Sequence, residues 1–468
     1  MLETIEHINS AVNGFVWGIP AMVCIIGVGL YLTIRTHGIQ FRKFGYTFKV
    51  TLGKLFHKKG AAEGAVTPFQ AVCTALASTV GTGNIAGVAG AIALGGPGAV
   101  FWMWCSALLG MCTKFSEVTL AVHFREKNEK GDWVGGPMYY IKNGLGPKFK
   151  WLACIYAVLG VLTVFGTGNA TQVNTITTAI DTAVLSYASA SDQFIHTMNL
   201  IIGIVIAVVV AMILLGGIKR IGQVTEKLVP FMALFYIVLA IGVIALNIQR
   251  VPAVFASIFE GAFTPSAVTG GAVGTFFLSM KNGVSRGIFS NEAGLGSAPI
   301  AAAAAHTEEP VRQGLVSMMG TIIDTLIICT MTGLAIVITD TWNIGLEGVA
   351  VTTAAFQRGL PLPDKVCSFI LMLCLIFFAF TTILGWDYYS ERCLEYLCHG
   401  NQKVVHVYRW IYILAVLIGP FMTISAVWTI ADIFNGLMAL PNLVALIALS
   451  GVIVAETKSY FERVPKYK

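Results

Sequence analysis

Long apolar runs recur along the whole chain, and their number and length constrain its fold more than any other feature. Each run is long enough to cross the hydrocarbon core of a bilayer as a helix, which takes about 20 residues. Helices satisfy their backbone groups within the segment, as lipid requires. The sequence therefore predicts an all-α polytopic membrane protein of 11 transmembrane helices, near residues 13–34, 68–93, 98–122, 151–180, 199–218, 228–247, 266–286, 313–338, 366–388, 408–428 and 437–455.

The composition supports this class and disfavours others. Of 468 residues, 56% are hydrophobic and 12% are charged, whereas soluble domains carry about 25% charged residues. The 10 cysteines are scattered without a CxxC pair or a Cys/His cluster, so we interpret them as packing residues. No GxSxG, HExxH or Walker motif stands out, so the sequence predicts neither an enzyme nor an enzymatic cofactor.

The positions of lysine and arginine predict an orientation. If loops alternate sides from the one after the first run, that side collects all but five of the 30 basic residues. The exceptions are Arg250, Arg358 and Lys365 on the other side, and Lys114 and Lys281 within spans. Because cytoplasmic loops are enriched in basic residues, we expect a protein of the cell (inner) membrane with its N-terminus outside and its C-terminus cytoplasmic. The net charge of +6 then needs no nucleic-acid partner.

The second run, TALASTVGTGNIAGVAGA at 74–91, interrupts its own helix at mid-span. Gly81 and Gly83 each carry a helix penalty of about 1 kcal/mol. An unwound turn here would free N–H groups at the start of the next half-helix, whose dipole favours an anion such as a carboxylate. The carbonyls that end the preceding half-helix, near Ala77 and Val80, would point the other way and suit a cation.

The same run also fits a simpler interpretation as a packing face, because glycine and alanine let helices approach closely. Gly87 and Gly90 match that interpretation. Asn84 adds a polar group that packing does not need, and this favours a functional break at 81–84.

A second interruption occurs in the seventh run, at residues 281–283. Broken spans at corresponding places in two halves of a chain indicate a transporter site near the bilayer midplane. Five spans in 68–247 and five in 266–455 would begin on opposite sides of the membrane, which predicts an inverted repeat. The run at 13–34 is then an extra N-terminal helix, and 456–468 is a cytoplasmic tail of this single transporter domain.

Polar side chains in two further spans are candidates for the same site. Asn169 and Gln172 lie three residues apart and share a helix face; a substrate contact or an interhelical hydrogen bond explains either one. Thr381 and Thr382 offer hard oxygen donors suited to a hard cation, although threonine hydroxyls often bond to their own helix. Trp386 either lines a substrate cavity, and so is a substrate-binding candidate, or anchors its span at the interface.

Charged residues within the spans are functional hypotheses by default. Asp324 has no obvious local partner: it is neutral, paired with Lys281, or a proton or cation ligand, and the sequence does not choose among these. Lys114 and Glu117 lie three residues apart, which favours an ion pair along one helix face.

Four segments carry a family resemblance: TALASTVGTGNIAGVAGAIALGGPGAVFWMW (74–104), GGPMYYI (135–141), GIFSNEAGLGSAPIAAAAAHTEEPVRQGLVSM (287–318) and TTILGWDYYSERCLEYL (381–397). They closely resemble the alanine/glycine:cation symporters, also called sodium:alanine symporters, and the match extends through essentially the whole chain. The resemblance implies the LeuT-like five-plus-five inverted repeat, within the amino acid–polyamine–organocation superfamily. It also implies import of small amino acids, mainly alanine and glycine, coupled to sodium or, in some members, to protons.

The resemblance also assigns substrate-binding positions. The carboxylate-binding turn falls on Thr82 and Gly83, and Gln172 reaches in from the fourth span. The wall of the side-chain pocket falls on three residues of the seventh span: Phe276, Phe277 and Met280.

Cation-binding positions follow in the same way. The family-like sodium site combines two carbonyls of the second span with two hydroxyls of the ninth: Ala77, Val80, Thr381 and Thr382. By looser analogy with the wider fold, Thr79 and Asn84 serve a second sodium.

We therefore expect a secondary active symporter that works by alternating access, with a small amino acid, Na⁺ and membrane lipid as its partners. The alternative within the same fold is a proton-coupled or uncoupled carrier. A channel and a membrane enzyme are rivals from other classes; Gly-rich breaks also occur in pores, whereas the catalytic residues of an enzyme are missing. No oligomeric state follows from the sequence.

Overall fold

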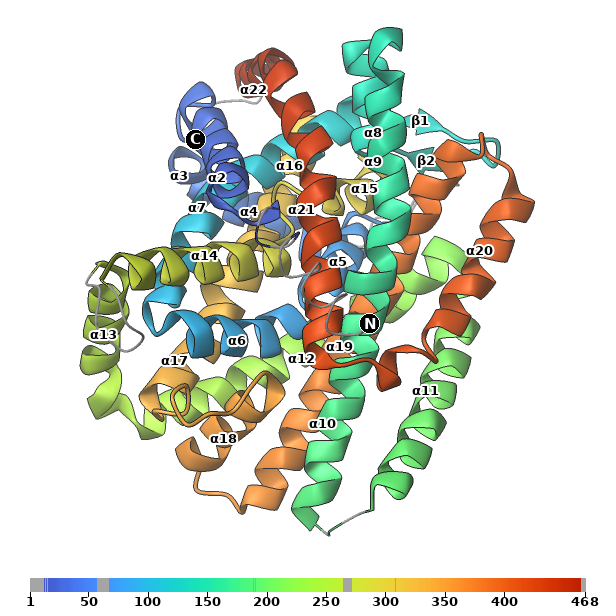
Figure 1. The fold of residues 1–468 in the computed structure, drawn as a ribbon. Helices are drawn as coiled ribbons and strands as arrows, with labels where there is room; N and C mark the ends of the chain where they lie inside the picture. Colours follow the sequence, from blue (N-terminus) through green and yellow to red (C-terminus); the bar gives the residue numbers. More distant parts are fainter. Residues whose placement is uncertain are drawn as a thin grey trace.

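The computed structural model describes residues 12, 14, 16–56, 67–187, 189, 191–263, 272–307 and 309–463, and it is almost entirely helical (Figure 1). Within these residues, eight helices are long and apolar enough to cross a membrane, or nine if one bent pair counts as a single span. The eight are Gly98–His123, Pro147–Tyr187, Asp192–Leu214, Gly217–Leu246, Pro310–Ile338, Asp364–Leu397, Gln402–Phe421 and Val427–Ala448. They overlap eight of the predicted runs, so the prediction of a helical, polytopic chain is confirmed.

The helices of membrane-spanning length in the described residues are fewer than the 11 predicted spans. The first run forms a shorter apolar helix, Pro20–Arg35, and the second run is the bent pair. The seventh run corresponds to α14, which is not among the eight helices. The count of 11 and the inverted repeat stay predictions.

The elements of the first half run from the N-terminal helix to the sixth predicted span. Short 3-10 or π-helical turns, labelled η, join several helices. The elements are α2 (Ile19–Arg35), α3 (Ile39–Arg42), α4 (Phe44–Phe56), α5 (Pro68–Thr79), η1 (Thr82–Asn84), α6 (Ala86–Gly95), α7 (Gly98–His123), β1 (Glu126–Lys127), β2 (Trp133–Val134), α8 (Pro137–Tyr140), η2 (Ile141–Leu145), η3 (Pro147–Phe149), α9 (Lys150–Thr163), η4 (Val164–Ala170), α10 (Thr171–Tyr187), α11 (Asp192–Leu214) and α12 (Gly217–Leu246).

The second half begins with a 3-10 turn and a short helix that packs against α7. Its elements are η5 (Ile248–Arg250), α13 (Val251–Phe263), α14 (Ala272–Asn291), α15 (Ala298–Ala303), α16 (Pro310–Thr321), η6 (Ile322–Cys329), α17 (Thr330–Ile338), α18 (Val349–Gly359), α19 (Asp364–Leu397), α20 (Gln402–Ala415), η7 (Gly419–Phe421), α21 (Ile424–Ala448) and α22 (Ser450–Arg463).

Two long helices organise the interior. Helix α7 packs against α14, α16 and α2, and α19 packs against α9, α10, α12 and α5. The broken span α5–η1–α6 lies between these groups, since α5 contacts α19 while α6 contacts α14. Helices from both halves of the chain therefore surround the break.

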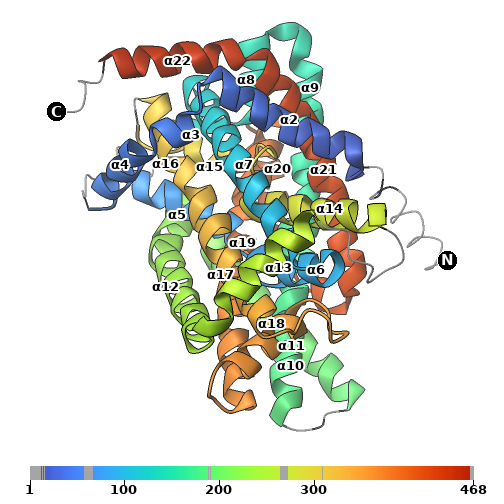
Figure 2. The same ribbon diagram turned by 90° about the vertical axis from the view of Figure 1, so that its left-hand side faces the viewer.

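The two ends of the molecule carry different elements. Figures 1 and 2 both place α3, α8 and α22 toward one end, and α18 with the C-terminal end of α10 and the N-terminal end of α11 toward the other. The predicted orientation of the two termini across the membrane stays a prediction.

The interruption predicted in the seventh run is misplaced. Residues 281–283 lie inside the continuous helix α14, and the helix ends only at Asn291. Gly283 is a packing residue, because a Cβ there would overlap the carbonyl oxygen of Ala99 on α7. The chain leaves helical geometry ten residues later, where Gly294 and Gly296 adopt φ of 92° and 76°, which glycine tolerates and other residues rarely adopt.

The last two spans begin earlier than predicted. Helix α20 starts at Gln402, and a 3-10 turn at Gly419–Phe421 separates it from α21, which extends to Ala448. Proline in that turn removes a backbone donor and favours the end of the helix. Of the stretch predicted as a tail, residues 456–463 lie in a separate helix, α22, and residues 464–468 lie outside the described residues.

Candidate functional site

Hydrogen bonds between side chains and the backbone stabilise both the start of α5 and the break that follows this helix. Helix α5 begins with a capping box in which Thr67 and Gln70 satisfy each other's backbone N–H groups. The two arms of the span meet at an angle of 57°. Across the gap Gly81 is extended, with φ −135° and ψ −154°, and its N–H donates to Asn84 Oδ1 at 2.8 Å. The predicted interruption of the second span is confirmed.

Thr82 and Gln172 meet at this turn. Both are buried, and the N–H of Thr82 lies 3.5 Å from Gln172 Oε1. Gln172 Nε2 donates to the carbonyl of Thr167 at 2.8 Å, which orients the amide toward the turn. Within the described part of the chain, Thr82 Oγ1 has no hydrogen-bond partner although it is buried. A buried hydroxyl of this kind is ready to bind a polar ligand.

Glycine at positions 81 and 83 lets neighbouring helices approach the turn. A Cβ on Gly81 would overlap Thr382 Oγ1 of α19, and one on Gly83 would lie 3.1 Å from the ring of Phe289 and 3.4 Å from Ser290 Cα of α14. The two glycines therefore serve close packing as well as the break. The motif that holds Phe289 and Ser290 was identified through the resemblance, but the sequence assigned neither residue a role.

One flank of the turn is closed by stacked rings and an ion pair. The rings of Phe289 and Trp428 lie 4.9 Å apart, and the guanidinium of Arg286 lies 4.8 Å from the Trp428 ring centroid. Arg286 donates two hydrogen bonds to Asp432 of α21, both at 2.8 Å. Such bidentate pairs are strong and geometrically specific.

Oxygen atoms cluster where α5 ends beside α19. Thr382 Oγ1 lies 3.1 Å from the carbonyl oxygen of Ala77 and 3.0 Å from that of Phe378, and Thr381 Oγ1 also lies 3.0 Å from the Phe378 oxygen. The structure thus brings Thr382 and Ala77 together, while Thr381 shares the Phe378 carbonyl with Thr382. Val80 follows as the residue that caps the end of α5, with its N–H bonded to the carbonyl of Leu76.

The carbonyl of Phe378 was not among the predicted residues. Its position could have been inferred, since a threonine hydroxyl in a helix commonly reaches the carbonyl four residues earlier. It adds a hard oxygen to a set suited to a hard cation.

The second predicted cation pair is not brought together. Thr79 Oγ1 donates to carbonyls of its own helix, with Ala75 at 3.1 Å. Asn84 Nδ2 instead donates to Asp324 Oδ1 at 2.6 Å, and Ser290 Oγ donates to Asp324 Oδ2 at 2.8 Å. The buried cluster of Asn84, Ser290 and Asp324 is therefore separate from the Thr79 hydroxyl.

Two alternatives about charges are wrong. Asp324 is surrounded by hydroxyl and amide donors, and the described ion pairs include none between it and Lys281. Lys114 and Glu117 form no direct ion pair either: Glu117 Oε1 accepts N–H bonds from Gly294 and Gly296, at 3.0 and 3.1 Å. The carboxylate is drawn to the glycine loop because free backbone donors point at it.

The predicted pocket wall on α14 lies away from the turn. Ser279 and Asn282 approach Gly95 at the far end of α6, whereas residues 289–290 approach Gly83. Phe276 packs against Trp102, with ring centroids 5.5 Å apart. Phe277 is 41% exposed and Met280 is partly buried. The structure does not bring these residues to Thr82, because α14 continues without a break through that region.

Trp386 lies inside the molecule. It is 1% exposed, and a Cβ on Gly168 would overlap it, so the alternative of an interfacial anchor is wrong. Asn169, by contrast, matches the interhelical alternative, since its Nδ2 donates to the carbonyl of Tyr412 at 3.0 Å.

These features define a class: an integral membrane protein whose long apolar helices surround a helix interrupted at mid-span, as in carriers. The comparison with known proteins identifies the family. The chain matches the sodium:alanine symporter family over residues 2–468 and belongs to it. It is thus a transporter of an amino-acid symporter family rather than an enzyme.

Relatives match along nearly their whole length. An "Uncharacterized transporter" of Haemophilus influenzae is 50% identical over 98% of this chain and 97% of the relative. The "Sodium/alanine symporter AgcS" of Methanococcus maripaludis is 44% identical over 98% of each chain. The "Probable sodium/glutamine symporter GlnT" of Bacillus subtilis is 37% identical over 98% of this chain and 91% of the relative.

Proposed function

We propose that this protein imports small neutral amino acids, alanine and glycine above all, by sodium-coupled symport with alternating access. The observation that carries the proposal is the break after α5. On one face the N–H of Thr82 lies 3.5 Å from Gln172 Oε1, and on the other the Ala77 carbonyl lies 3.1 Å from the Thr382 hydroxyl. One interruption thus provides donors for a carboxylate and oxygens for a cation, which is what coupling the two requires.

In the substrate site, backbone N–H groups of the turn bind the carboxylate of the amino acid. The amide of Gln172 binds its remaining polar atoms, and the unpartnered Thr82 hydroxyl supplies a further bond. Phe289, which contacts Gly83, and buried Trp386 limit the space for the side chain. Accommodating an extra methylene in a packed wall costs about 1–3 kcal/mol, which favours alanine and glycine.

In the cation site, Na⁺ takes oxygens from both halves of the chain. We assign it the carbonyls of Ala77, Val80 and Phe378 and the hydroxyls of Thr381 and Thr382. Because the ion bridges α5 and α19, its binding favours one relative position of these helices. The affinity for substrate at the same turn then depends on whether the ion is bound, which couples the binding of the two ligands.

The relatives support sodium and alanine as ligands, since AgcS bears the name of a sodium/alanine symporter. GlnT, named for glutamine, is less similar. Proton coupling is the second candidate, because another relative, 35% identical, is named a "Putative sodium/proton-dependent alanine carrier protein".

The proposed orientation has the N-terminus outside and the C-terminus in the cytoplasm, with residues 68–247 and 266–455 as inverted repeats. Inward sodium movement then drives import. One charge across 100 mV provides about 2.3 kcal/mol, and a tenfold sodium gradient adds about 1.4 kcal/mol. One ion therefore supports roughly 500-fold accumulation.

Uptake of labelled alanine into proteoliposomes tests the proposal. We expect concentrative, saturable uptake with an inward sodium gradient and none when choline replaces sodium. Uptake that follows a proton gradient in choline would favour the proton-coupled carrier. Uptake that only equilibrates would rule out symport, and flux that fails to saturate would favour a channel.

A further inference from the structure

A lysine is buried in the helical bundle without a bonding partner. Lys114, on α7, is 3% exposed. Its Nζ is enclosed and makes no hydrogen bond within the described part of the chain. A buried ammonium without a direct partner is unfavourable unless charges nearby compensate it.

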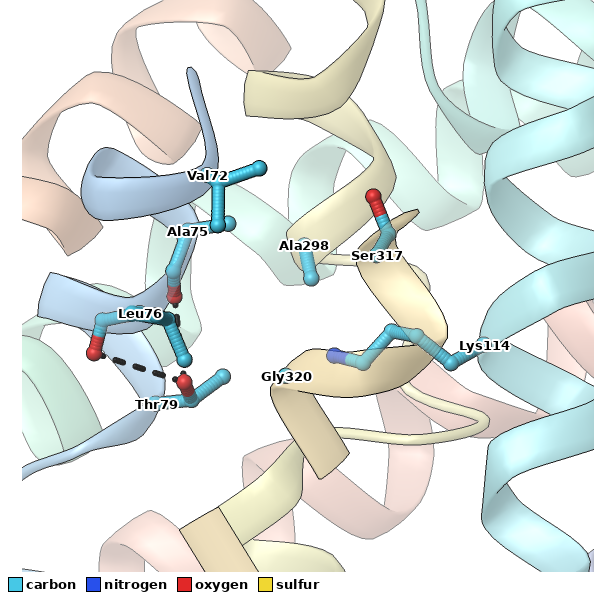
Figure 3. A pocket seen from close by; sticks show the side chains of 8 residues that line it. All are labelled: Val72, Ala75, Leu76, Thr79, Lys114, Ala298, Ser317 and Gly320. Atoms are coloured by element: carbon cyan, nitrogen blue, oxygen red, sulfur yellow. Dashed lines mark hydrogen bonds between the residues drawn. The ribbon is translucent and has the colours of Figure 1, made fainter. Parts of the chain in front are cut away.

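The side chain of Lys114 extends into a small cavity (Figure 3). The cavity lies between α5, which contributes Thr79, and α15 and α16, which contribute Ala298 and Ser317. The volume that the centre of a water molecule can occupy in this cavity is about 20 Å³. This leaves room for about one water molecule and is too little for an amino acid. The cavity therefore has room for a water molecule beside the Lys114 side chain.

Three buried carboxylates stabilise this charge from a distance. Glu117, Glu292 and Asp324 come from three segments, are each at most 1% exposed, and all attract the Lys114 ammonium. Their described hydrogen bonds go to other donors. With all four groups ionised, the cluster holds three negative charges and one positive charge.

The cluster is connected to the broken span. Asp324 accepts a hydrogen bond from Asn84 at 2.6 Å, and Asn84 accepts one from the N–H of Gly81 at 2.8 Å. Gly81 follows directly on the α5 terminus whose carbonyls form the proposed sodium site. A sodium ion there is attracted by the carboxylates and repelled by Lys114.

We propose that Lys114 is a built-in counter-cation that sets the sodium affinity of the carrier. It balances part of the carboxylate charge when sodium is absent, and it weakens sodium binding so that the ion can leave. This inference rests on the proposed function, because it needs sodium at the end of α5.

The test compares Lys114→Met with Lys365→Met. Methionine keeps much of the length of lysine and removes its charge; Lys365 lies at the start of α19, 5.2 Å from the ring of Tyr187, away from the cluster. We expect Lys114→Met to lower the half-saturating sodium concentration for alanine uptake about tenfold. That change corresponds to about 1.4 kcal/mol. Lys365→Met should change the half-saturating sodium concentration less than twofold.

A second readout separates charge from folding. Sodium should raise the melting temperature of purified Lys114→Met at lower concentrations than for wild type, without alanine. If Lys114→Met does not fold, Glu292→Gln is the variant that tests the inference. It removes a negative charge and should raise the half-saturating sodium concentration. Unchanged sodium dependence in whichever variant folds overturns this inference, whereas wild-type uptake without sodium dependence overturns the proposed function itself.

Discussion

Replacement of Thr382 by valine tests the proposed sodium site most directly. Valine has nearly the shape of threonine, so the change removes one oxygen and leaves the packing of α19 almost intact. In the structure that oxygen lies 3.1 Å from the Ala77 carbonyl and 3.0 Å from the Phe378 carbonyl. The variant therefore places a methyl group where the ion would meet both helices.

The expected magnitude follows from this geometry. A polar contact to a charged group contributes about 1.5–3 kcal/mol, so its loss should raise the half-saturating sodium concentration roughly 10- to 150-fold. Thr381→Val should have a smaller effect, because Thr381 Oγ1 contacts carbonyls of its own helix and Met232 rather than α5.

The assay is sodium-dependent uptake of labelled alanine in proteoliposomes, at saturating alanine and varied sodium. Thr119→Val is the matched control: Thr119 is fully buried on α7 and its hydroxyl donates to Phe115 of the same helix at 2.8 Å. It should shift the sodium dependence less than twofold. A folded Thr382→Val protein with wild-type sodium dependence would refute the assignment of α5 and α19 to one ion site.

Two further predictions concern the substrate side of the turn. Gln172→Ala should weaken alanine binding at least tenfold with little change in melting temperature, measured by competition against labelled alanine; unchanged affinity would remove Gln172 from the site. Gly83→Ala should lower uptake strongly, because its Cβ would lie 3.1 Å from the Phe289 ring and overpacking costs about 1–3 kcal/mol. Phe289→Leu in the same chain should restore part of the uptake, and no recovery would argue against that contact.

The broken second span shows what the local sequence can predict about the interruption of a helix. Two glycines around Thr82 and the polar Asn84 predicted the interruption, and the helix does end at Thr79. In the seventh span the same reasoning failed, because Gly283 serves close packing against α7. Glycine identity alone does not distinguish a break from a packing contact; the neighbouring helix does.

The site residues also divide into those that the sequence predicted and those that only the structure revealed. Thr82 with Gln172 and Ala77 with Thr382 were named from the sequence, and the structure places each pair together. The partners of Asp324 were not foreseen, since Asn84 and Ser290 lie far from it along the chain. Their association depends on how α14 and η6 pack around the turn.

The sequence by itself determined that this chain crosses a membrane as apolar helices and that one of them breaks at mid-span. Both properties follow from local causes, namely the cost of unpaired backbone in lipid and the helix penalty of glycine. Only the tertiary structure decided which groups face that break, where the seventh span is interrupted, and that Lys114 shares its surroundings with three carboxylates. These depend on contacts between distant segments, whose geometry is set by the packing of whole helices.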